Sequence, residues 1–212
     1  MSQEAAYFAA AFPRERLILG ERVQPLSLGH AMLLHLIETP FFLAEAKVGD
    51  GDLAVVVVLC SRKFKDAFEV INQPERLRQL SEGLLWRKSE ERLQEARQIV
   101  YEYLVRSFDP PPVKRNSGPG RPAGAPFLLS VKLTLQMDLG YSEADALDMP
   151  LSKALWEHIG ALDRKGLVEM LTPEQAKEQD ERKQRERDYI SQVQQMIREK
   201  FEAEQRAKEG QS

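Results

Sequence analysis

Cysteine is almost absent from this sequence, and so are long apolar runs. The single cysteine, Cys60, excludes a disulfide within the chain and is typical of proteins from reducing compartments. The longest apolar run, residues 53–60, is far too short to cross a bilayer. The first residues lack the basic segment and the apolar core of a secretory signal. We therefore expect a cytoplasmic protein with no segment in a membrane.

An excess of positive charge is also lacking. Lysine and arginine number 30 against 33 acidic residues, which gives a formal net charge of −3. Such a balance predicts no general attraction to nucleic acid or to anionic lipid. Residues 118–122 contain the Gly-Arg-Pro core of an AT-hook, a motif that binds the minor groove, but the basic pair Lys114 and Arg115 is several residues away. We do not expect DNA to be a partner.

Histidine, a frequent catalytic and metal-binding side chain, occurs only 3 times. His30 and His35 are too far apart to share one helix face, as a metal-binding pair would. His158 lies alone on a predicted helix, and Cys60 lies in an apolar run typical of a core. Residues 49–52 are Gly-Asp-Gly-Asp, but the regular oxygen ligands and the distal glutamate of a calcium loop are not in place. The sequence thus predicts no catalytic residue, no metal and no cofactor, and it favours a protein that is not an enzyme.

Helical spacing of apolar residues dominates the sequence and predicts an all-α protein in four parts. Residues 1–108 make a helical front domain. Residues 109–126 are rich in proline and glycine, which disfavour regular structure, and form a linker. Residues 127–171 make a small three-helix unit, and residues 172–212 form a long, charged C-terminal helix.

Within the front domain, the pattern leaves two segments open. Residues 53–60 have the β-branched composition of a buried strand. No turn signal follows them, however, so we favour one buried helix over residues 53–71, with or without a break, and a strand at 53–60 is the alternative. Around Gly20, residues 17–26 form either a tight β-turn or an extended lead-in to the next helix.

The other front-domain helices have clearer start and core signals. Ser27 precedes the apolar periodicity of residues 28–38 and is placed to cap that helix. Trp86 is expected to pack between the helix before it and the helix after it. That later helix carries a core-facing stripe, which consists of Leu93, Ala96, Val100, Tyr103 and Leu104.

Start and stop signals are densest around Gly140. This glycine can end the mostly buried helix of residues 127–139 in the left-handed conformation. Ser142 is placed to cap a short helix, and Pro150 to begin another helix that Gly166 ends. The small unit is therefore predicted to contain three helices with little loop between them.

The C-terminal helix begins with Thr172 as cap and Pro173 in the first turn. Residues 177–188 are almost all charged or amide side chains, which predicts a solvated helix. Beyond it runs a candidate partner-binding surface, here named the tail stripe, which consists of Ile190, Val193, Met196, Ile197 and Phe201. A client helix, a second copy of the chain or the front domain could cover it. We favour the client first and self-association second.

Three segments resemble a known family. Residues 140–151, Gly-Tyr-Ser-Glu-Ala-Asp-Ala-Leu-Asp-Met-Pro-Leu, resemble the glycine–aromatic–serine turn before the last helix of small phage tail assembly chaperones. Residues 26–41 and 52–62 resemble the front half of uncharacterised proteins from structural gene clusters of tailed phages and prophages. The resemblance implies a non-enzymatic helical protein of the bacterial host cytoplasm that binds tape-measure or other tail components during assembly. The alternative is a structural virion component, such as a connector or tail-completion protein.

Removal of the tail stripe tests whether it is a binding surface. A chain truncated after Asp188 should keep the melting temperature of the body, because residues 177–188 are too polar to pack into a core. It should lose co-purification with its tail client, or lose dimerisation in light scattering. Unchanged binding and mass behaviour would show that the stripe binds nothing, and unfolding of the body would show that the stripe belongs to the core.

Overall fold

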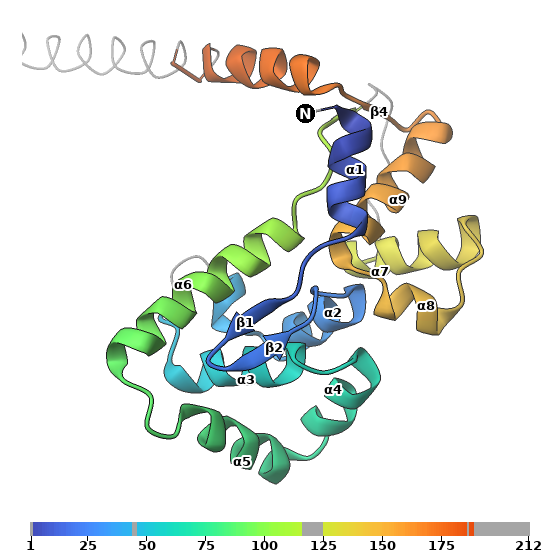
Figure 1. Ribbon diagram of the computed structural model, residues 1–212. Coiled ribbons are helices and arrows are strands. Elements are labelled where there is room, and N and C mark those ends of the chain that lie inside the picture. Colours follow the sequence, from blue (N-terminus) through green and yellow to red (C-terminus); the bar gives the residue numbers. More distant parts are fainter. Residues whose placement is uncertain (1, 44–45, 116–124, 186, 189–212) are drawn as a thin grey trace, which may run out of the picture. The chain divides into compact units, whose positions relative to one another are not determined.

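The computed structural model describes residues 2–43, 46–115, 125–185 and 187–188, and Figure 1 gives their course. The chain divides into two compact units, Met1–Met170 and Leu171–Ser212. The protein is built mainly from helices, so the predicted all-α class is confirmed.

In the first unit, helices follow one another with short connections. The elements before the proline-rich stretch are α1 (Gln3–Ala11), α2 (Leu28–Leu36), the 3₁₀ turn η1 (Pro40–Phe42), α3 (Asp50–Cys60), α4 (Phe64–Ile71), α5 (Pro74–Leu85) and α6 (Glu90–Ser107). After it come α7 (Phe127–Leu133), the π-helical turn η2 (Thr134–Asp138), α8 (Glu143–Asp148) and α9 (Leu151–Arg164). The strands form two antiparallel pairs, β1 (Arg16–Ile18) with β2 (Glu21–Val23), and β3 (Val113–Arg115) with β4 (Val168–Met170).

Several helix boundaries follow the sequence signals. The Ser27 hydroxyl accepts a hydrogen bond of 3.3 Å from the backbone N–H of His30 and so caps α2. Every member of the predicted stripe on α6 is buried. Gly140 and Gly166 have φ angles of 74° and 68°, as expected for glycines that end helices. These predictions are confirmed.

The chain over residues 53–71 is helical, as favoured, with a break that divides it between α3 and α4. The part with strand-like composition belongs to α3. The Ser61 hydroxyl and the Arg62 guanidinium both donate to the carbonyl of Val58, which satisfies an acceptor at the end of α3. A short turn then separates α3 from α4.

Around Gly20 the chain forms a β-hairpin rather than an extended lead-in. In the pairing of β1 with β2, Ile18 lies opposite Glu21. Leu19 and Gly20 form the turn with φ angles of 54° and 93°, the combination that suits a tight hairpin. The pairing places Ile18 and Val23 in the core, each 1% exposed.

Part of the predicted linker is a strand. Within residues 109–126, β3 pairs with β4, and Lys114 forms an ion pair of 3.5 Å with Glu169 opposite it. Buried residues on both sides of this stretch, such as Leu59 and Leu155, belong to one hydrophobic core. The first compact unit therefore includes residues that the sequence pattern divided between a front domain and a separate small unit.

Two packing expectations are wrong. The helical segment of residues 127–139 is only partly buried, because Leu135 lies in the core whereas Met137 is 78% exposed. Trp86 does not pack between α5 and α6 but is 71% exposed. The guanidinium carbon of Arg87 lies 5.7 Å from the centroid of its ring.

A short bridge of backbone hydrogen bonds, here named the junction, joins the start of α2 to the start of α9. The N–H of Leu28 donates to the carbonyl of Met149 at 2.9 Å. The N–H of Leu151 donates to the carbonyl of Leu26 at 2.7 Å. Since both helices begin at the junction, it fixes the place where each starts relative to the other (Figure 1).

The second unit begins with a reciprocal cap. The Thr172 hydroxyl accepts from the N–H of Gln175 at 3.3 Å, and the Gln175 side-chain oxygen accepts from the N–H of Thr172 at 2.8 Å. Residues 173–185 are helical, as predicted from Thr172 and Pro173.

Close packing beside the junction provides a test of this arrangement. A Cβ at Gly29 would lie 2.5 Å from the Phe64 ring and 2.9 Å from the carbonyl oxygen of Leu147. Gly29→Ala should therefore lower the free energy of unfolding by about 1–3 kcal/mol in urea denaturation, as overpacking does. Gly83→Ala, in α5, is the matched control, because no atom lies within 4 Å of a Cβ there. The control should stabilise the chain by up to about 1 kcal/mol; equal effects of the two substitutions would contradict the packing.

Candidate protein-binding groove

Helix α6 presents a second face outside the core. Its buried stripe packs inward, partly against α3. Gln94, Gln98, Tyr101 and Val105 follow one another at spacings of four, three and four residues, so they share another face of the helix. Tyr101 and Val105 are 55% and 53% exposed. This face is one wall of a groove.

The opposite wall comes from the segment that follows α2. Its lining residues are Pro40, Phe41, Phe42, Leu43, Ala46 and Val48. Phe42 packs edge-on against Phe108, just beyond the C-terminal end of α6, with ring centroids 5.5 Å apart. Leu43 is 55% exposed. The wall is therefore apolar, and an aromatic contact anchors it near the end of α6.

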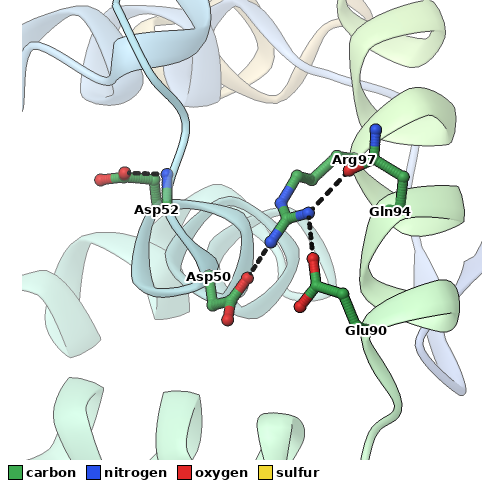
Figure 2. A network of polar contacts seen from close by, with 6 residues as sticks. Asp50, Asp52, Glu90, Gln94 and Arg97 are labelled. Carbon is green, nitrogen blue, oxygen red and sulfur yellow. Dashed lines mark hydrogen bonds and ion pairs between the residues drawn. The ribbon is translucent and has the colours of Figure 1, made fainter.

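Arg97 forms the polar end of the groove (Figure 2). Its guanidinium donates to the carboxylates of Glu90, at 3.1 Å, and Asp50, and to the amide oxygen of Gln94, at 2.8 Å. The pKa of Arg97 is raised, chiefly by the hydrogen bond to Glu90. The guanidinium is paired with two carboxylates and its side chain is only 20% exposed, so the positive charge of Arg97 is already matched within the protein.

The same network fastens the start of α3 to α6. Asp50 is the first residue of α3, and its ion pair with Arg97 joins the two helices. The carboxylate of Asp52 accepts from the N–H of Gly49 at 2.9 Å (Figure 2), and both acidic groups suit the positive end of the helix dipole. The groove wall that follows α2 ends at Val48, just before α3 begins at Asp50. The ion pair of Asp50 with Arg97 therefore also holds this end of the wall.

The groove is an open surface depression of about 630 Å³. Exposed apolar side chains on both walls suit it to receive apolar side chains of another molecule. Sequence reasoning missed this surface because it assigned α6 a single stripe. The available signal was Tyr101 and Val105, two large apolar residues four apart on a face of α6 that the core stripe does not use.

Several side chains of the types best suited to catalysis, those of histidine, cysteine, serine, threonine and tyrosine, lie in the core instead. They form three pairs, which are Ser27 with His30, Thr134 with His158, and Cys60 with Tyr103. The Nδ1 atoms of His30 and His158 lie 2.8 and 2.9 Å from their hydroxyl partners, and burial lowers the pKa of both histidines. Burial raises the pKa of the Cys60 thiol to about 12. All six side chains are buried, and each pair gives a buried polar atom a partner within the protein.

Among the side chains that the structure describes, no cluster of three or more His, Cys, Asp or Glu residues could hold a metal ion. None of the described helices is long and apolar enough to cross a membrane. The tail stripe, with its residues Ile190, Val193, Met196, Ile197 and Phe201, lies outside the described residues. Comparisons with protein-family models, curated proteins and solved structures gave no match.

The buried imidazole of His30 makes stability depend on pH. Burial lowers its pKa, while the backbone carbonyls of Arg62 and Leu59 and the charge of Asp148 act in the opposite direction. The unfolded chain, with a histidine pKa of about 6.5, therefore binds the proton first as the pH falls. Stability that is present above about pH 6.5 is lost as the pH falls from there towards the folded-state pKa.

The urea midpoint of the chain should accordingly decrease between about pH 7 and about pH 5.5. His30→Gln should flatten this decrease, even though it lowers stability at neutral pH. If the variant and the parent lose stability equally over this range, His30 does not carry the pH dependence.

Proposed function

We propose that this chain is a non-enzymatic assembly factor of a tailed phage, a tail assembly chaperone that binds tape-measure or other tail components in the host cytoplasm. The client class in this proposal comes from the resemblance of residues 140–151 to tail assembly chaperones, and from that of residues 26–41 and 52–62 to uncharacterised proteins of phage structural gene clusters. The structural observation that supports a binding role is the two-walled apolar groove on α6. The groove is where a client side chain would be buried.

The shape of the groove favours a helix as the bound segment. From Gln94 to Val105 the α6 wall is roughly 16 Å long at 1.5 Å per residue. That length matches about three turns of a partner helix whose apolar residues recur every three or four positions. Two helices packed in this way bury their apolar faces together, with Tyr101 and Val105 at the contact.

The charges beside the groove favour one kind of client helix. Glu91 and Glu102 lie next to the groove face on the helical wheel of α6. A client helix with lysine or arginine beside its apolar stripe would complement these carboxylates. Such pairs lie at the rim, so they contribute mainly to selectivity and to the rate of association.

Co-expression with the tape-measure protein of the same gene cluster tests the proposal. Tyr101→Arg combined with Val105→Glu should reduce co-purification of the tape-measure protein by tenfold or more, because both charges would enter an apolar contact. Leu17→Arg on β1 is the matched control, since Leu17 is 71% exposed and lies outside the groove. Both variants should keep the unfolding free energy within about 0.5 kcal/mol, the usual range for exposed positions.

Two outcomes would oppose the proposal. Co-purification that both variants leave intact would show that the groove does not bind this client. Mass spectrometry of purified particles separates the chaperone from the alternative, a structural virion component such as a connector or tail-completion protein. A chaperone should be missing from the particles, and a stoichiometric presence there would favour the structural role.

A further inference from the structure

A second hollow lies on another side of the first unit and has a different chemical character. It encloses about 500 Å³ between α1, the start of β1, the C-terminal end of α6, residues 110–112 and α9. We name it the arginine cleft. It shares none of its lining residues with the groove.

Three arginines line the arginine cleft, namely Arg14, Arg16 and Arg106. Against them stands one acidic lining residue, Asp109. Within the described residues, Arg14 and Arg16 form no ion pair, whereas Arg106 forms a long, exposed ion pair of 4.0 Å with Glu102 of the same helix. The cleft is therefore locally cationic on a chain whose formal net charge is −3.

The neutral polar groups of the cleft already have partners within the protein. The Tyr103 hydroxyl donates to the carbonyl of Gln24 at 2.8 Å. The hydroxyls of Ser107 and Ser152 each donate to a backbone carbonyl at 2.7 Å. The lining prolines carry no N–H group, so that part of the backbone cannot donate to a ligand. The arginines are thus the side chains left to hold a ligand, and they require an anionic acceptor.

The rest of the lining is apolar. Trp156 lines the cleft and packs edge-on against Tyr7 of α1, with ring centroids 5.9 Å apart. Leu26 lines the cleft from the start of the junction, and the prolines of residues 110–112 line it from the chain after α6. A small inorganic anion would leave this apolar surface uncovered, whereas a short chain bearing carboxylates would cover it.

We propose that the arginine cleft binds an acidic peptide segment of a partner protein. The carboxylates pair with Arg14, Arg16 and Arg106, and the aliphatic parts of the peptide lie against Trp156 and the prolines. This site is independent of the groove, so the chain would contact one partner, or two, at two surfaces of opposite character.

Hexaglutamate labelled with fluorescein is the probe, and its anisotropy is measured on titration with the full-length chain. Arg14→Gln combined with Arg106→Gln should weaken binding roughly tenfold or more, the loss expected for charge-assisted hydrogen bonds. Arg78→Gln is the matched control, because Arg78 is an exposed arginine of α5 that pairs with Glu75 and Glu82 far from the cleft lining. The control should bind as the parent does.

A titration with unlabelled peptide, followed by the emission of Trp156, tests whether the peptide binds in the arginine cleft. In a Trp86→Phe background, Trp156 is the sole tryptophan, because the chain has 2. Saturating hexaglutamate should change its emission, and hexaglutamine should not. The proposal is overturned if the double arginine variant binds as the control does, or if binding leaves Trp156 emission unchanged. It is also overturned if inorganic phosphate at equal ionic strength displaces the peptide at similar concentrations, since the site would then select any anion.

Discussion

The hydrogen bonds of the junction are the constraint on which the first unit depends. They tie Leu26 and Leu28, near the start of the chain, to Leu151 and Met149, which lie beyond the proline-rich stretch. The N-terminal cap of α2 and the first turn of α9 both lie at the junction. A substitution that broke its hydrogen bonds would therefore displace both helices. Gly29 tightens this arrangement, because its missing side chain lets Phe64 and Leu147 approach the backbone of α2. The core then forms on both sides of the junction rather than in two separate domains.

Helix α6 is the element that links this core to the two candidate binding surfaces. Its inner stripe is buried, its outer face supplies Tyr101 and Val105 to the groove, and its last turn supplies Arg106 to the arginine cleft. One rigid helix therefore sets the position of both surfaces. Since α6 is long and capped by Ser89, whose hydroxyl accepts from the N–H of Arg92, the residues that α6 contributes to each surface are held on a regular helix.

Local signals predicted the helices well, and long-range contacts explain what they missed. Ser27 and Gly140 act on their immediate neighbours, so their roles could be predicted from the adjacent residues. The strand β3 could not, because its partner β4 lies far along the chain and proline and glycine around it suggest irregular structure. The exposure of Trp86 could not be predicted from the sequence either. Its side chain is large and apolar, but whether it is buried depends on how α5 and α6 pack. The groove and the arginine cleft are lined by residues from segments far apart in the sequence, and no short motif predicts that these segments lie side by side.

The long separation across the junction has a consequence for synthesis on the ribosome. Leu26 is translated well before Leu151, and at 5–20 residues per second the interval is roughly 6–25 s. During that interval α2 gains its cap and its contacts with α3 and α4, but it lacks the backbone partners of the junction and the helices α7, α8 and α9 that pack against it. The nascent front part therefore exposes apolar surface of α2 until the last third of the chain emerges, which lengthens the time in which it can aggregate.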